Sequence, residues 1–378
     1  MLFGLCCLVF FPYLLRPNLI GADSYAFANV SCHQTPLKNV PALSLIVFSA
    51  IPCSFLAFKL LLFACFTVST LLVGKLGGLY SKNGWLAGVF IFLSPYWLKY
   101  FTHFEDDQLA MPFLVLSLYL FFKGKQENKL LPQALAVGIA CLTTLLIWNG
   151  GIFFLFGLAM TSAIGFAVAY PLLLFNFKKL FYSIKPMHSA GTVLETIPFI
   201  GFYFLYLLII GFRGLPTGFI PMVWLFSMFT LMQAKWHILL MPLLAVGVIR
   251  VFEGLDKLRK IFLCVLLVVL MGAFMFSGIF IQQPHPSNYA GVEFGVEKSI
   301  DLNVPIYNDW SWGHLVEYFG GEPSAKAGAT PQPLGRFAGV IITDKSLDSV
   351  GSWVTTDCVL LESFRDLNVF HCVLVDRE

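Results

Sequence analysis

Residues 58–74 read FKLLLFACFTVSTLLVG, an apolar run that contains one charged residue, Lys59. A helix needs about 20 apolar residues to cross the hydrocarbon core of a bilayer, and shorter runs are accommodated where the bilayer thins. The run is therefore predicted to be a membrane-spanning helix. Similar runs recur along the chain at 2–15, 84–101, 108–123, 131–147, 196–212, 218–233, 237–250 and 260–281.

The composition is typical of a membrane protein. Of the 378 residues, 58% are hydrophobic and 12% are charged, whereas soluble domains carry about 25% charged residues. We expect a polytopic α-helical membrane domain over 1–282 with about 9–11 transmembrane helices. A small soluble α/β domain is expected over 283–378, with strand candidates at 340–343, 359–361 and 369–375. The net charge of +3 is spread over short loops, so no nucleic-acid partner is predicted.

The basic residues predict the orientation in the membrane, because Lys and Arg gather in cytoplasmic loops. They occur in three loops, which contain Lys75 and Lys82, then Lys123, Lys125 and Lys129, then Arg250, Lys257, Arg259 and Lys260. The loops at 17–40, 102–107, 148–151, 187–195 and 233–235, together with the C-terminal tail, are then expected outside the cytoplasm. Two stretches do not fit a single crossing. The segment 152–182 requires an even number of crossings, which a hairpin near 165–171 would supply, and 41–57 is expected to lie along the interface.

The nine cysteines have no metal-binding spacing. Those inside apolar runs are predicted to be packing residues: Cys6, Cys7, Cys53, Cys65, Cys141 and Cys264. Cys358 and Cys372 lie in the tail, where they either form a disulfide, if the tail faces an oxidising compartment, or remain thiols. The triplet Asn29-Val30-Ser31 matches an N-glycosylation acceptor, a short pattern that often arises by chance.

Acidic residues recur on the predicted outer side of the membrane. Asp23 follows the first span, Glu105 and Asp107 precede the fourth, and Glu195 precedes the span at 196–212. Hard divalent cations prefer oxygen ligands, so carboxylates that converge from separate loops would hold Mn²⁺ or Mg²⁺ and attract a diphosphate. The alternative is that each acid stabilises a helix N-terminus through the helix dipole. Their spacing does not decide between these interpretations.

Several of these residues lie in stretches that resemble, in the same order, the catalytic subunit of oligosaccharyltransferase, a class C membrane glycosyltransferase. The stretches are DSYAFA at 23–28, HFEDDQLA at 103–110, IWNGG at 147–151, TVLE at 192–195, KWHILLMP at 235–242 and DWSWG at 309–313. The resemblance implies an integral membrane, metal-dependent enzyme whose active site and C-terminal domain face the extracytoplasmic side. It implies transfer of a glycan from a polyprenyl-(di)phosphate donor to an acceptor polypeptide, at asparagine.

The resemblance also implies roles for individual residues. Asp23, Glu105, Asp107 and Glu195 would bind the metal, with Asp23 and Glu195 also orienting the acceptor amide as catalytic residues. Lys235 would contact the donor phosphate, and Asp309, Trp310, Ser311, Trp312 and Gly313 would bind the acceptor. Two positions depart from the family. Lys235 replaces an arginine and lacks its bidentate fork, and Ser311 replaces the aspartate with which the family recognises the hydroxyl residue of the acceptor.

Two alternative functions fit the same pattern. A class C enzyme that uses a polyprenyl-monophosphate sugar and acts on hydroxyl or lipid acceptors also needs acidic loops. The altered tryptophan motif favours this alternative slightly, whereas the late-loop Glu195 argues against it. A transporter or flippase would use the acids as ion sites, although such sites usually lie near the bilayer midplane.

Overall fold

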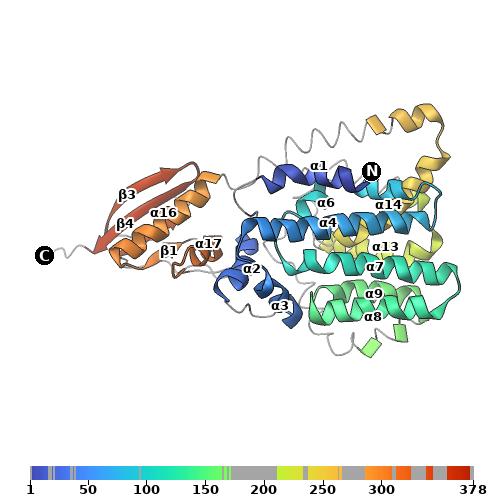
Figure 1. Ribbon diagram of the computed structural model, residues 1–378, viewed down its shortest axis with the longest axis horizontal. Helices are drawn as coiled ribbons and strands as arrows, with labels where there is room; N and C mark the ends of the chain where they lie inside the picture. The colour runs from blue at the N-terminus through green and yellow to red at the C-terminus, as the bar shows by residue number, and fades with distance from the viewer. Residues whose placement is uncertain are drawn as a thin grey trace.

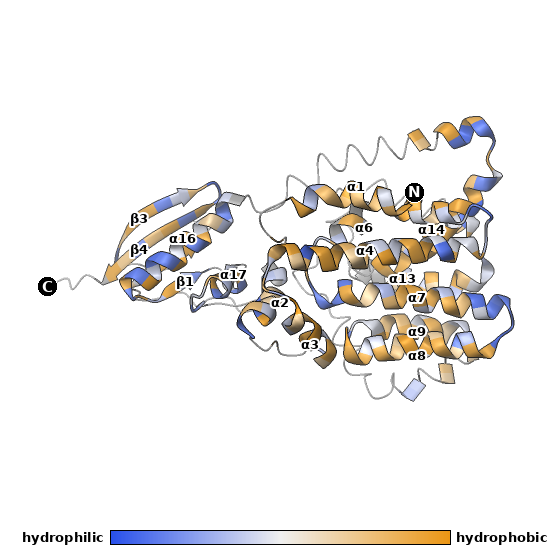
Figure 2. Ribbon diagram, in the orientation of Figure 1, coloured by the Kyte–Doolittle hydropathy of each residue, from blue (hydrophilic) through white to orange (hydrophobic). Residues whose placement is uncertain are grey.

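The computed structural model describes residues 2–15, 19, 22–34, 37, 40–92, 95–163, 166–167, 170–171, 211–232, 237–262, 264–265, 286–308, 312–324, 338–343 and 356–374. Within these residues the protein is mostly helical. A bundle of lengthwise helices forms the larger part, and a tail with a small β-sheet lies beyond one end of the bundle (Figure 1). Apolar residues dominate the bundle helices, and hydrophilic residues cluster at the turns farthest from the tail (Figure 2).

The bundle helices follow the apolar runs of the sequence. They are α1 (Leu2–Leu14), α4 (Phe55–Gly78), α5 (Trp85–Phe92), α6 (Pro95–Tyr100), α7 (Asp106–Gln126), α8 (Leu130–Leu146), α9 (Gly151–Thr161), α13 (Ile220–Met232) and α14 (His237–Gly254). The predicted helices at 2–15, 58–74, 108–123, 131–147, 218–233 and 237–250 are confirmed. Within the run at 84–101 the structure describes two helices, α5, which ends at Phe92, and α6, which begins at Pro95. Most of 196–212, of 260–281 and of the second half of 152–182 lies outside the described residues.

One helix among the described residues, α4, is long and apolar enough to cross a membrane. The shorter apolar helices are Leu2–Leu14, Leu130–Leu146, Gly151–Thr161 and Thr217–Met228. The α4 helix contacts α1, α5 and α7. Its crossing with α5 is close, because Gly77 of α4 faces the backbone of Gly84, which precedes α5. Small residues allow such close approach between helices.

Two short helices lie at the end of the bundle nearest the tail. The helix α2 (Ala22–His33) forms within a segment that the sequence predicted to be a loop. Its residues 24–30 are all buried, including Tyr25, Ala28 and Val30, and tertiary packing of this kind explains why so short a segment is helical. The helix α3 (Ala42–Ala50) corresponds to the stretch expected to lie along the interface, and it ends before Pro52.

The basic loops gather at the opposite end of the bundle. Gln126, at the end of α7, donates a hydrogen bond to the carbonyl of Leu79, after α4 (2.9 Å). Ser81, in the α4–α5 turn, donates to the carboxylate of Glu253 near the end of α14. The three predicted cytoplasmic loops therefore lie on one side of the bundle, and α2 and the tail lie on the other (Figure 1).

The tail is a small α/β unit. Its elements are α16 (Pro286–Leu302), β1 (Ile306–Asn308), α17 (Gly313–Tyr318), β2 (Gly339–Thr343), β3 (Thr356–Phe364) and β4 (Leu367–Leu374). The strand order is β1-β2-β4-β3, with β1 parallel to β2 and the other pairs antiparallel. The three predicted strands are confirmed, whereas β1 and both helices were not predicted. Gly291 and Gly295 allow α16 to pack closely against Leu367, Ile342 and Val369 of the sheet.

Two disulfides are present among the described residues. Cys358 and Cys372 face each other across β3 and β4 and are bonded, which selects the first of the two predicted alternatives. Cys32, at the end of α2, is bonded to Cys53, just before α4. The prediction that Cys53 is a packing residue inside an apolar run was therefore wrong, because its side chain is exposed and disulfide-bonded. The fold of α2 back toward α4 brings the two sulfur atoms together.

Candidate functional site

Two of the predicted acidic motifs meet at the end of the bundle nearest the tail. The hydroxyl oxygen of Ser24, next to Asp23, accepts a hydrogen bond from the backbone N–H of Phe104, next to Glu105 (2.7 Å). Both Ser24 and Phe104 are fully buried. This contact joins residues that are far apart in the chain, so the structure brings the backbones of the first two motifs together. The Asp23 side chain itself lies outside the description.

The second motif occupies the start of α7. Glu105 is the residue before the first turn, and Asp106 and Asp107 lie in that turn. All three side chains are partly buried. The helix dipole stabilises carboxylates at this position. The acids are therefore placed where they stabilise the N-terminus of α7, as the alternative interpretation requires. It does not conflict with metal binding, because partly buried carboxylate oxygens are also suitable ligands for Mn²⁺ or Mg²⁺.

Aromatic packing fixes the loop that leads into these acids. The ring of Phe104 stacks on Phe58 of α4 (4.6 Å between centroids) and contacts Phe48 of α3 edge-on (5.0 Å). Two residues before Phe104, the carbonyl of Thr102 accepts a hydrogen bond from the hydroxyl of Tyr13 in α1 (2.8 Å). Helices α1, α3 and α4 therefore all contact the loop that precedes the acids.

A buried cation for which the sequence predicted no role lies next to this loop. Lys59 is only 1% exposed, and its ammonium group lies 5.4 Å from the centre of the Tyr13 ring, whose hydroxyl bonds to Thr102. Burying a charge is costly unless other groups compensate for it. A single lysine inside an apolar run is the sequence signal that would have identified this position.

The tail docks on α2 through α17. Asn29 donates from its side-chain amide to the carbonyl of His314 (3.1 Å) and to the carboxylate of Glu317 (3.3 Å). The Tyr318 ring packs against Tyr25 (5.3 Å) and stacks on Phe55 at the start of α4 (5.4 Å). Burial, followed by the neighbouring Tyr289, raises the pKa of the Tyr25 hydroxyl, so this group stays neutral.

The glycosylation triplet at 29–31 is part of this interface. Asn29 is 1% exposed, and its amide nitrogen is engaged with α17. The Ser31 hydroxyl donates to the carbonyl of Ile51. In the folded protein the side chains of the triplet are therefore engaged in packing and hydrogen bonds.

The tryptophan motif lies partly in the described residues. Trp312 immediately precedes α17, is 9% exposed and packs edge-on against Tyr289 of α16 (6.5 Å). Gly313 is buried at the first position of α17. Their position connects the motif to the helix that docks on α2. Asp309, Trp310 and Ser311 lie outside the described residues, so their predicted contacts with an acceptor are untested.

The complete metal site is likewise not described. Glu195 and Lys235 lie outside the described residues, as does the side chain of Asp23. Among the side chains that are described, no group of three or more His, Cys, Asp or Glu residues is placed to hold a metal ion. Glu105 and Asp107 are the two predicted ligands whose side chains are described, and the Ser24–Phe104 contact places the stretch that contains Asp23 beside them.

Similarity to other proteins does not add to this description. No protein-family model matches the chain, and no curated protein matches it.

Proposed function

We propose that this protein is a polytopic membrane glycosyltransferase that transfers a glycan from a polyprenyl-(di)phosphate donor to an asparagine of an acceptor polypeptide. The observation that carries the proposal is the hydrogen bond between Ser24 and Phe104, which joins the first two acidic motifs. Motifs that resemble one enzyme family only in sequence need not be neighbours in space. Their contact, at the end of the bundle where the tail docks, supports a common site.

The proposed site lies on the extracytoplasmic face of the membrane. The loops rich in Lys and Arg gather at the opposite end of the bundle, as cytoplasmic loops do. Both disulfides lie in segments at the site end, α2 and the tail, and disulfides form in oxidising compartments. These two observations are independent of the resemblance and agree with each other.

The chemistry assigned to the residues follows from their charge and position. Asp23, Glu105, Asp107 and Glu195 would hold Mn²⁺ or Mg²⁺, which when bound neutralises charge on the leaving phosphate. Lys235 would contact the same phosphate as a point charge. Asp23 and Glu195 would orient the acceptor amide, and residues 309–313 would bind the acceptor chain. The partly buried position of Glu105 and Asp107 keeps their charge effective, because screening by water is reduced there.

The experiment compares neighbouring acids in α7. Purified protein receives a lipid-diphosphate-linked glycan and a peptide that contains Asn-x-Ser/Thr, with Mn²⁺ present, and the product is measured by mass spectrometry. Asp107→Asn and Glu105→Gln should lower the rate about 100-fold or more, because a metal ligand is lost. Asp106→Asn is the matched control, since this residue shares the helix turn but is not at a predicted ligand position.

Three outcomes decide the proposal. Loss of product with EDTA, rescue by Mn²⁺ and a specific effect of Glu105 and Asp107 support it. Product formed only from a polyprenyl-monophosphate sugar and a hydroxyl or lipid acceptor would replace it with the alternative that the altered tryptophan motif favours. Movement of substrate across vesicles without any glycosylated product would indicate a transporter.

A further inference from the structure

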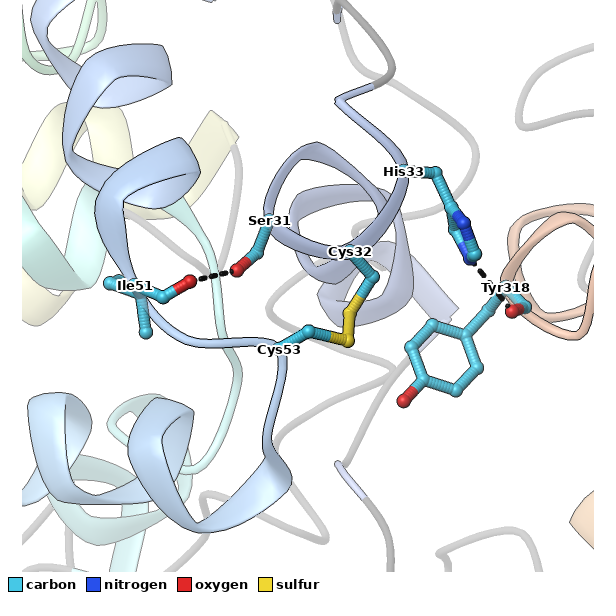
Figure 3. Close-up of a disulfide and its surroundings, with 6 residues drawn as sticks. All are labelled: Ser31, Cys32, His33, Ile51, Cys53 and Tyr318. Atoms are coloured by element: carbon cyan, nitrogen blue, oxygen red, sulfur yellow. Dashed lines mark hydrogen bonds between the residues drawn. A yellow bond between two sulfur atoms is a disulfide. The ribbon is translucent and has the colours of Figure 1, made fainter.

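The helix α2 is held at both of its ends. At its N-terminal end, Ser24 bonds to Phe104, just before the acidic segment of α7. At its C-terminal end, Cys32 is linked to Cys53 with the Cα atoms 4.8 Å apart, and Ser31 donates to the carbonyl of Ile51 (Figure 3). The two fixed ends define the direction in which α2 lies across the end of the bundle.

The same helix also receives the tail. Asn29 bonds to His314 and Glu317 of α17, and the imidazole Nε2 of His33 lies 3.0 Å from the carbonyl oxygen of Tyr318 (Figure 3). His33 is adjacent to the disulfide-bonded Cys32. A change in the position of α2 would therefore alter its contacts both with the loop before the acidic segment and with α17.

The non-covalent contacts alone hold α2 in position only weakly. A helix of 12 residues is marginal in isolation, and each hydrogen bond contributes only about 0.5–1.5 kcal/mol net. A disulfide that joins residues 21 positions apart removes many alternative conformations of the segment between them. The covalent link is therefore the strongest restraint on the C-terminal end of α2.

We propose that the Cys32–Cys53 disulfide is a positioning element of the transfer site. It fixes α2 so that Ser24, next to Asp23, meets Phe104, next to Glu105, while Asn29 binds α17. The role in metal binding rests on the proposed function, whereas the effect on α2 and on the docking of the tail does not. The second disulfide, Cys358–Cys372, lies between β3 and β4 and provides an internal control.

The experiment compares two double variants of the full-length protein purified in detergent. Cys32→Ser/Cys53→Ser should raise hydrogen exchange of the amides in 22–33 and 313–318 by about tenfold, because local opening becomes easier. Its affinity for Mn²⁺ should fall about tenfold, as expected when a ligand-bearing segment loses its support. Cys358→Ser/Cys372→Ser should leave both measurements unchanged.

Rescue separates positioning from a general loss of structure. In the Cys358→Ser/Cys372→Ser variant, dithiothreitol reduces Cys32–Cys53 to two thiols and becomes a cyclic disulfide. Oxidised glutathione then restores the bond and is reduced to two molecules of glutathione. After removal of the reagents, the exchange of α2 and the Mn²⁺ affinity should return to their original values.

The outcomes are distinct. Unchanged exchange of 22–33 in the Cys32→Ser/Cys53→Ser variant overturns the inference, and so do equal effects of the two double variants. If wild-type protein binds no Mn²⁺, the proposed metal-dependent function fails. The exchange measurement then still decides whether the disulfide positions α2 and the tail.

Discussion

The close crossing of α4 and α5 permits a comparison between two adjacent glycines. A Cβ atom on Gly77 would lie 2.4 Å from the carbonyl oxygen of Gly84 and 2.7 Å from the Cβ of Ala87, whereas a Cβ on Gly78 would meet nothing within 4 Å. Ordinary contact begins at 3.4 Å, so relief of the first contact requires a shift of 3.4 − 2.4 = 1.0 Å. We predict that Gly77→Ala destabilises the protein and that Gly78→Ala does not.

The magnitude follows from the difference between the two variants. Both replace glycine by alanine near the end of α4, so the gain in helix propensity, at most about 1 kcal/mol, is common to both. Overpacking a close contact costs about 1–3 kcal/mol. Gly77→Ala should therefore be less stable than Gly78→Ala by about 1–3 kcal/mol, which corresponds to a melting temperature lower by a few degrees.

The assay is thermal unfolding of the purified variants in detergent, followed by size-exclusion chromatography of the fraction that remains monodisperse. Wild type and both variants are heated side by side. Equal melting temperatures for the two variants would refute the reasoning, and so would a Gly77→Ala protein that is more stable than Gly78→Ala. Either result would mean that α5 and the preceding turn move without cost, so that the crossing is not tightly packed.

Further predictions concern Glu253, Asn29 and Gly320. The hydrogen bond from Ser81 lowers the pKa of Glu253 below 4.5, so its stabilising effect is present above pH 4.5 and disappears as the pH falls through the lowered value. Glu253→Gln should reduce the melting temperature at pH 7 but not in acid. Glu297→Gln, at an exposed site, should leave the melting temperature unchanged at both pH values. A loss of melting temperature in Glu253→Gln that is the same at both pH values would contradict this. Asn29→Gln should change the mass of protein from a glycosylating host only by the added methylene group, because Asn29 is buried, and loss of a glycan mass would show that the triplet is used. Gly320→Ala should cost about 1 kcal/mol in thermal unfolding through its φ of +89° alone, as no atom lies near its Cβ position, and an unchanged melting temperature would exclude this strain.

The apolar runs predicted most of the bundle because burial of apolar side chains determines where those helices form. The helix α2 was not predicted, since its sequence mixes small, polar and aromatic residues and shows no long apolar run. Its polar side chains, Ser24 and Asn29, bond to residues far away in the chain. Such partners can only be identified once the helices are placed in space.

The candidate site was predictable to a different degree. The sequence indicated the acids of α7 and their place at a helix start, and the structure confirms that place. It did not indicate that Cys53 would leave an apolar run to pair with Cys32, nor that Lys59 would be buried beside the acidic loop. Both depend on how α1, α2 and α4 pack together, and residue type along the chain carries little information about that packing.

The tail disulfide has a consequence for production of the protein. Cys358 and Cys372 pin the alignment of the β3–β4 hairpin, and β3 is an edge strand that exposes Val359, Leu360 and Leu361. An edge strand with exposed apolar residues can pair with another chain when its alignment is loose. Synthesis under reducing conditions would leave this hairpin without its disulfide. The yield of monodisperse protein would then depend on how soon the chain reaches an oxidising environment.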